Sequence, residues 1–140
     1  MSDVVFFDTN VLLDVLLARK PFVRDAQRLW SLAEEGQIQA VVSAVSFLNV
    51  YYVVRRLASR READRAVRGM QAVFQVAPVT REVIDQAIEA DAADFEDAVQ
   101  HACAVRAAAL CIVTRDGRHF ARSALPILAP DAFLANLGSE

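Results

Sequence analysis

Three aspartates of this chain come after predicted strands or lie in the first turn of a predicted helix, where their side chains can come close together. Asp8 follows the apolar run "VVFF", Asp116 comes just after "CIVT", and Asp97 lies in "DFEDA", in the first turn of a predicted helix. Carboxylates brought together repel one another, which raises their pKa values unless a cation neutralises them. An all-oxygen set suits Mg²⁺ or Mn²⁺, and the chain has no paired Cys/His spacing typical of zinc. The three aspartates are therefore candidate metal ligands, with His101 four residues after Asp97 as an uncertain neighbour.

Helix capping is the alternative explanation for these acidic residues. Asp, Thr and Asn are favoured N-caps, and "DTN" at residues 8–10 stands where a helix is expected to begin. In "DFED", Asp94 can cap the next helix, with Asp97 where a capping box carries Glu or Gln. Each acid taken alone fits capping as well as function, and only their combination favours one shared site.

The elements that must position these residues form an alternating pattern. Short apolar runs, "VVFF", "IQAVVS", "FQVAPV", "ALCIVT" and "PILAP", alternate with helical segments, and "DAFLANL" adds a terminal helix. Apolar strands without polar alternation indicate a parallel sheet covered on both faces, so the fold class is an open α/β fold. Its ligands are expected outside the carboxyl ends of the strands, where Asp8 and Asp116 fall. The predicted helices span residues 10–18, 22–35, 45–58, 61–73, 81–92 and 95–109.

Length and composition predict one domain over residues 1–140. Hydrophobic residues make up 55% of the chain, more than in an ordinary soluble domain, which favours an interface on the surface. The apolar runs are too short to span a membrane and no signal peptide is recognisable, so we expect a cytoplasmic protein. Cys103 and Cys111 lie in apolar segments and are expected to be buried thiols.

The charge distribution indicates how a polyanion can bind. The net charge of −3 argues against a nucleic-acid partner, yet six arginines fall within residues 55–68 while acids concentrate at 82–97. Arg55 and Arg56 in this cluster are candidate contacts for the phosphates of a nucleic acid or for an acidic segment of a partner protein, and Arg115 beside Asp116 is a candidate phosphate contact, because the guanidinium fork suits phosphate and carboxylate. A solvated helix face paired with neighbouring acids is the alternative for the cluster.

Four segments in this order and at these separations resemble the PIN-domain nucleases, including the VapC-like toxins of bacterial toxin-antitoxin pairs. They are "VVFFDTNVLLDVLL", "VVSAVSFLNVYYVVRR", "DFEDAVQHACA" and "IVTRDGRHF", and the similarity covers essentially the whole chain. The resemblance implies a three-layer α/β/α sandwich with a central parallel sheet in strand order 3-2-1-4-5. It also implies Mg²⁺- or Mn²⁺-dependent ribonuclease activity.

The resemblance assigns roles to individual residues. Asp8, Asp97 and Asp116 match the acidic cluster that holds the metal. Supporting positions are Thr9, Asn10 and Thr114, which match residues that hold the cluster by hydrogen bonds.

One position departs from the commonest pattern of the family. Asn49 stands where many members have a glutamate, and an amide carries no charge and cannot act as a base. A subgroup of the family shares "LNVYY" and "DFEDA", which makes Asn49 a candidate normal state there. Asp94 or Glu96 then supplies the fourth carboxylate, and the three-residue spacing to Asp97 favours Asp94.

The leading hypothesis is therefore RNA hydrolysis by a metal-bound water, in a toxin that a small antitoxin protein covers. The alternative is a degenerate PIN scaffold that binds RNA or a partner without cutting. The run "FLNVYYVV" is a candidate homodimer face or antitoxin groove, with buried core as its other explanation.

Two other protein classes place an aspartate after the first strand. Haloacid dehalogenase-type phosphatases need a second aspartate where this chain has Asn10. Both they and receiver domains use a late lysine, whereas the single lysine here is Lys20. Neither class fits.

Overall fold

The computed structural model describes residues 3–120 and 122–138 of the chain. Within these residues, five parallel strands form one sheet in the order β3-β2-β1-β4-β5, which confirms the predicted α/β fold and strand order. The strands are β1 (Val4–Phe7), β2 (Gln39–Ser43), β3 (Gln75–Ala77), β4 (Cys111–Val113) and β5 (Ile127–Leu128).

Seven helices of the described residues cover this sheet, and their positions agree closely with the predicted segments. They are α1 (Thr9–Leu16), α2 (Val23–Glu34), α3 (Ala44–Leu57), α4 (Arg60–Val73), α5 (Arg81–Ala90), α6 (Phe95–Arg106) and α7 (Pro130–Gly138). A 3-10 helix, η1 (Gly117–Phe120), was not predicted, because four residues are too few to show a period.

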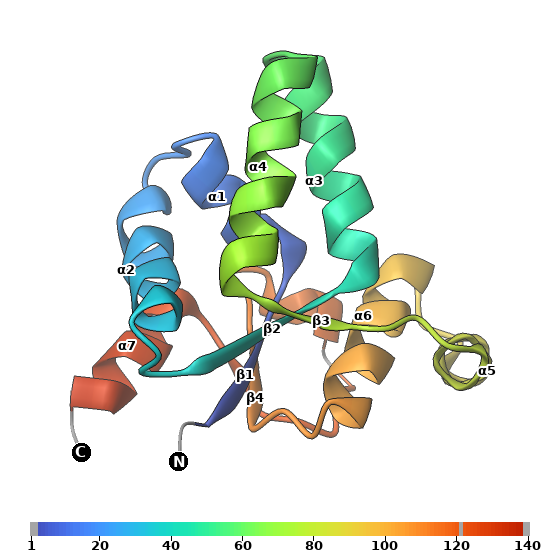
Figure 1. Ribbon diagram of the computed structural model, residues 1–140. Coiled ribbons are helices and arrows are strands. Elements are labelled where there is room, and N and C mark those ends of the chain that lie inside the picture. Colours follow the sequence, from blue (N-terminus) through green and yellow to red (C-terminus); the bar gives the residue numbers. More distant parts are fainter. Residues whose placement is uncertain (1–2, 121, 139–140) are drawn as a thin grey trace.

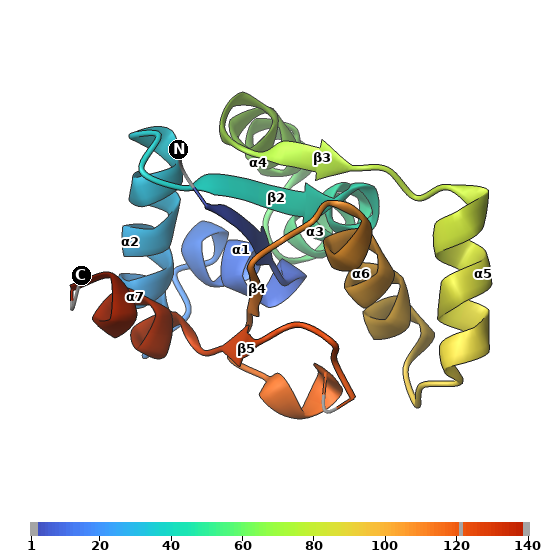
Figure 2. The ribbon, with the colours of Figure 1, turned by 90° about the horizontal axis from the view of Figure 1, so that it is seen from below.

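Both faces of the sheet are buried, which explains why its strands lack polar alternation. In β1, Val5 and Phe7 pack into a core shared with α1 to α4 and α7, while Phe6 packs into a second core with α5 and α6. Successive side chains of a strand point to opposite faces, so an uninterrupted apolar run is required when helices cover both. Figures 1 and 2 show the helices on the two sides of the sheet.

Local capping chemistry explains where several helices begin. Ser43 Oγ, Ser59 Oγ and Thr80 Oγ1 accept hydrogen bonds from backbone N–H groups in the first turns of α3, α4 and α5. These bonds satisfy donors that a helix start otherwise leaves without a partner.

Helices α3 and α4 form an antiparallel pair that extends past the edge of the sheet (Figure 1). Val50 and Val54 of α3 are buried, whereas Leu48 and Tyr52 of the same helix are 70% and 79% exposed. The run "FLNVYYVV" therefore packs into the core with one face of α3 and exposes apolar side chains on the other face. Among the described residues, no helix combines the length and the apolar character needed to cross a membrane.

Candidate active site

The register of the sheet brings Asp8 and Thr114 together. Phe7 of β1 lies beside Val113 of β4, so the next residue of each strand leaves the sheet at the same place. Asp8 is 3% exposed and its Oδ2 accepts a hydrogen bond of 2.8 Å from Thr114 Oγ1. Asp8 occupies the N-cap position of α1, yet within the described residues its side chain makes no capping hydrogen bond. Capping therefore does not explain this aspartate, and its carboxylate belongs to the strand-end cluster.

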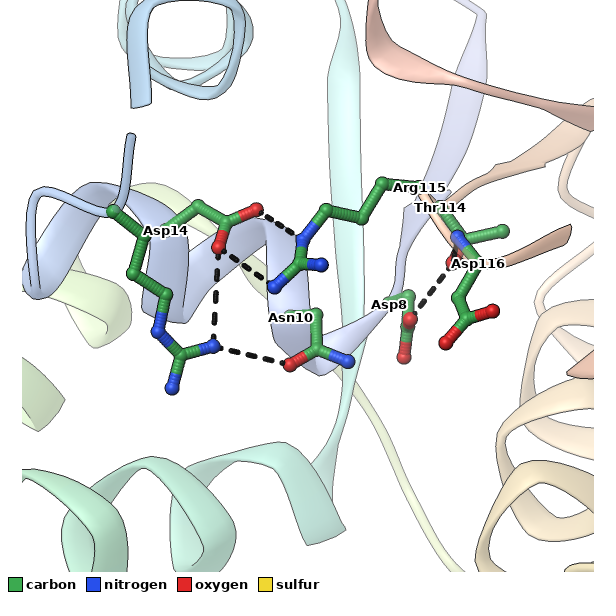
Figure 3. A network of polar contacts seen from close by, with 7 residues as sticks. Asp8, Asn10, Asp14, Thr114, Arg115 and Asp116 are labelled. Carbon is green, nitrogen blue, oxygen red and sulfur yellow. Dashed lines mark hydrogen bonds and ion pairs between the residues drawn. The ribbon is translucent and has the colours of Figure 1, made fainter. Parts of the chain in front are cut away.

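The same hydroxyl fixes the segment that carries Asp116. The backbone N–H of Asp116 donates to Thr114 Oγ1 at 3.0 Å, so this oxygen is a donor to one aspartate and an acceptor from the other. In Figure 3 the carboxyl groups of Asp8 and Asp116 point the same way from the strand ends. Thr114 thus sets the relative position of two of the three predicted ligands.

Helix α6 carries three further acidic side chains, with Asp94 at its N-cap and Glu96 and Asp97 in its first turn. Asp94 Oδ1 accepts a hydrogen bond of 3.0 Å from the backbone N–H of Asp97, so Asp94 is the helix cap that its sequence allowed. Glu96 Oε1 accepts from Asn49 Nδ2 at 2.7 Å, which ties α6 to α3. Burial raises the pKa of Glu96, and the carboxylates of Asp94 and Asp8 raise it further.

These contacts bear on which residue provides the fourth carboxylate. Helical spacing favoured Asp94, but the structure occupies Asp94 in capping and places Glu96 within electrostatic reach of Asp8. Asn49, at the position where a glutamate was expected, holds Glu96 through its amide. Asp94 and Glu96 both stay predictions for the fourth carboxylate, and the contact with Asn49 is an argument for Glu96.

Two supporting residues have separate tasks. Thr9 Oγ1 and Ser46 Oγ share a buried hydrogen bond of 2.7 Å that joins α1 to α3. Asn10 Oδ1 accepts a hydrogen bond of 3.4 Å from Arg19 Nη1. Ser46 was missed by sequence reasoning, although its place three residues before Asn49 on one helix was a usable signal.

Comparison with known proteins identifies the family. The sequence profile described as a PIN domain matches residues 4–118. The chain belongs to the PIN-domain family. The resemblance stated from the sequence is thereby confirmed, while the subgroup with Asn49 stays a prediction.

Solved structures similar to this PIN domain include toxins of the VapC type. VapC20 of Mycobacterium tuberculosis, described as a sarcin-ricin loop cleaving toxin, is 22% identical, with a TM-score of 0.70 over 84% of this chain and 94% of that one. A toxin-antitoxin complex from Klebsiella pneumoniae is 19% identical, with a TM-score of 0.67 over 90% and 97%. DNA-bound VapBC from Salmonella typhimurium is 14% identical, with a TM-score of 0.69 over 93% and 99%. A search of curated proteins found no significant match.

The donor set of this PIN domain suits a hard cation chemically. Its oxygens come from carboxylates, and the pKa of Glu96 is raised first by burial and then by the carboxylates of Asp94 and Asp8, both of which a bound cation would offset. Within residues 3–120 and 122–138, however, no three His, Cys, Asp or Glu side chains lie close enough to hold one ion. Side chains of the cluster would have to converge around it.

His101 adds no ligand to this set. Its Nε2 accepts a hydrogen bond of 3.2 Å from the backbone N–H of Ala124, and burial lowers its pKa. The ring is therefore a neutral acceptor for the loop after η1.

A pocket of about 460 Å³ opens beside the acidic cluster. Asp94 and Asp97 line it together with Arg118 and Arg122. Sequence reasoning did not select these two arginines, although both follow Asp116 closely in the chain. Their place makes them candidates for contact with a phosphate group.

The arginines that the sequence predicted as RNA contacts, Arg55, Arg56 and Arg115, are not among the described residues that line this pocket. Arg55 and Arg56 are exposed in the last turn of α3, where they line a pocket with Tyr51 and Tyr52. That turn is about 9 Å along the helix from Asn49, at 1.5 Å per residue. Arg115 donates from Nε and Nη2 to the carboxylate of Asp14, so its guanidinium turns toward α1.

Proposed function

We propose that this PIN domain is an endoribonuclease that hydrolyses RNA phosphodiester bonds with Mg²⁺ or Mn²⁺. The observation that carries the proposal is the Thr114 hydroxyl, which holds Asp8 and Asp116 together at the ends of two neighbouring strands. Family membership and the acidic side chains of α6 support it. Helix capping, the alternative explanation for the acidic residues, accounts for Asp94 but not for Asp8.

Each residue of the cluster has a distinct task in this proposal. Asp8, Asp97 and Asp116 would hold the ion, with Glu96 as fourth carboxylate and Asn49 orienting it. A bound ion supplies a water of lowered pKa and offsets charge on the phosphate.

Substrate binding falls to the arginines. Arg118 and Arg122 line the same pocket as Asp94 and Asp97, where they would contact RNA phosphates. Arg55 and Arg56 would meet a more distant part of the strand.

We further propose a toxin role with a small antitoxin protein as partner, and a homodimer. Several similar structures are toxin-antitoxin complexes, which supports the pairing. The exposed Leu48 and Tyr52 of α3 supply apolar surface for such a contact.

An RNA cleavage assay tests the activity. Wild-type protein should cleave total RNA with Mg²⁺ or Mn²⁺ and stop on chelation, and Asp8→Asn and Asp97→Asn should each be inactive while still folded. Asp85→Asn, an exposed aspartate of α5 paired with Arg81, is the matched control and should keep full activity. Cleavage activity that persists in both Asp8→Asn and Asp97→Asn would refute the proposal.

The second candidate function is a scaffold that binds RNA or a partner protein without cutting. Two observations favour it: the uncharged Asn49, and the separation of the acidic side chains among the described residues. Calorimetric titration with Mn²⁺ distinguishes the two functions. Saturable binding that disappears in Asp116→Asn supports the enzyme, whereas no binding at millimolar Mn²⁺ supports the scaffold.

A further inference from the structure

Asp14 of α1 is a buried charged residue that the proposed reaction does not use. It is 1% exposed, and its two oxygens accept from Arg115, at 2.8 Å from Nε to Oδ2 and 3.2 Å from Nη2 to Oδ1. The Arg115 guanidinium also lies over the ring of Phe22, with Cζ 4.0 Å from the ring centroid. A bidentate pair of this kind fixes both the distance and the orientation of the two groups.

Arg115, the partner of Asp14, lies between two residues of the candidate active site. Thr114, which holds Asp8, precedes Arg115 and Asp116 follows it. In Figure 3 the side chain of Arg115 runs toward Asp14 of α1 and away from the carboxyl groups of Asp8 and Asp116. The ion pair between Asp14 and Arg115 therefore fixes residues 114–116 to α1.

A second arm connects the same carboxylate to the start of α1. Arg19 Nη1 lies 3.8 Å from Asp14 Oδ1 and donates to Asn10 Oδ1 at 3.4 Å. Asp14 thus joins the two chain segments that carry Asp8 and Asp116.

Stability alone is a weak reason for such a pair. Burying the Asp14 carboxylate and most of the Arg115 side chain is costly, and well-packed apolar residues often replace a buried ion pair without loss. What an apolar pair cannot supply is a fixed direction for the chain between Thr114 and Asp116.

We propose that Asp14 and Arg115 are positioning residues, which hold the Asp116 carboxylate at the geometry that a divalent cation requires. The inference rests on the proposed function, and it gives Arg115 a role other than contact with RNA. Asp14 is too deeply buried to touch a substrate, so its substitution can affect metal binding only indirectly, through Arg115 and Arg19 or through lost stability.

The test compares Asp14→Asn, Arg115→Met and the double variant Asp14→Leu/Arg115→Met with the wild type. Mn²⁺ affinity is measured by calorimetry, and kcat and KM by RNA cleavage. Each variant should bind Mn²⁺ about 10- to 100-fold more weakly, the range for groups that orient metal ligands, with lower kcat and unchanged KM. The effects should not add, because both residues act as one unit. If a single variant unfolds, the double variant still tests the proposal, because it replaces the ion pair by apolar side chains and leaves no unpaired buried charge.

Two outcomes would overturn the proposal. Arg115→Met that raises KM without changing Mn²⁺ affinity would make Arg115 an RNA contact. Met70→Ala, a buried substitution in α4, controls for lost stability, and an equal loss of Mn²⁺ affinity there would make the pair merely structural.

Failure of the proposed function would be visible separately, as wild-type protein that neither binds Mn²⁺ nor cleaves RNA. Hydrogen exchange of amides 114–118 in metal-free protein then still tests the pair. Exchange should be faster in Asp14→Asn than in Met70→Ala, and equal exchange in the two would overturn the positioning role.

Discussion

Thr114 Oγ1 donates a hydrogen bond of 2.8 Å to Asp8 Oδ2, across 106 positions of the chain. The same oxygen accepts from the backbone N–H of Asp116 at 3.0 Å. One buried hydroxyl therefore connects two strand ends, and its loss leaves both an acceptor and a donor without that partner. The relative position of the two aspartates therefore depends on this threonine.

Replacing this hydroxyl by a methyl group should affect stability and activity together. We expect Thr114→Val to lower the free energy of unfolding by about 1–3 kcal/mol, because buried polar groups lose a partner. Cleavage should fall about 10- to 100-fold, as for other groups that orient metal ligands. Urea unfolding and a cleavage assay measure the two effects. Thr80→Ala, which removes the cap of α5, is the control that should lose stability but keep activity; equal activity losses in the two variants would contradict the prediction.

Glu96 should make metal-free stability depend on pH. Its pKa in the folded chain lies above the usual 4.5, because of burial and the carboxylates of Asp94 and Asp8, so folding favours its protonated form. This contribution to stability is present below pH 4.5 and is lost as pH rises through the raised pKa. In EDTA near neutral pH, Glu96→Gln should therefore melt higher than the wild type, and the difference should narrow on acidification. Mn²⁺ should raise the melting temperature of the wild type more than that of Glu96→Gln. A variant that melts lower than the wild type in EDTA would refute this.

The pocket arginines should contribute to RNA affinity in a salt-dependent way. A contact with a phosphate of single-stranded RNA changes the slope of log K against log salt by about 0.7. Arg118→Ala and Arg122→Ala should each reduce the slope by that amount in binding titrations with an uncleavable RNA. Arg28→Ala removes an exposed charge from α2, away from the pocket, and should leave the slope unchanged. The same slope in all four proteins would exclude both arginines as contacts.

The buried thiol of Cys111 should destabilise the fold at alkaline pH. Burial raises its pKa from 9.0 to about 11, with a smaller contribution from Asp3. The unfolded thiol ionises first, so the stability that Cys111 contributes is present below pH 9.0 and is lost as pH rises toward about 11. Urea unfolding between about pH 8 and about pH 10.5 should show a steeper decline for the wild type than for Cys111→Ala. Parallel declines would show that the thiol is not the cause.

Much of the fold could be predicted because its signals are local. The uninterrupted apolar runs of β1 and β4 indicated strands buried on both faces, and residues such as Ser43 and Thr80 carried the capping chemistry of α3 and α5. The strand order came from family resemblance, because periodicity describes one element at a time and not its neighbours. The short η1 gave no periodic signal, so it was missed.

The sequence by itself determined which residue types could form the site and which strand ends they would leave. It did not determine the contacts between Asn49 and Glu96 or between Asp14 and Arg115, which join residues 47 and 101 positions apart. Those pairings follow from strand register and helix packing, which place distant segments within hydrogen-bond distance. Tertiary structure therefore decided that Asp94 is a cap, that Glu96 lies within electrostatic reach of Asp8, and that Arg115 turns toward Asp14.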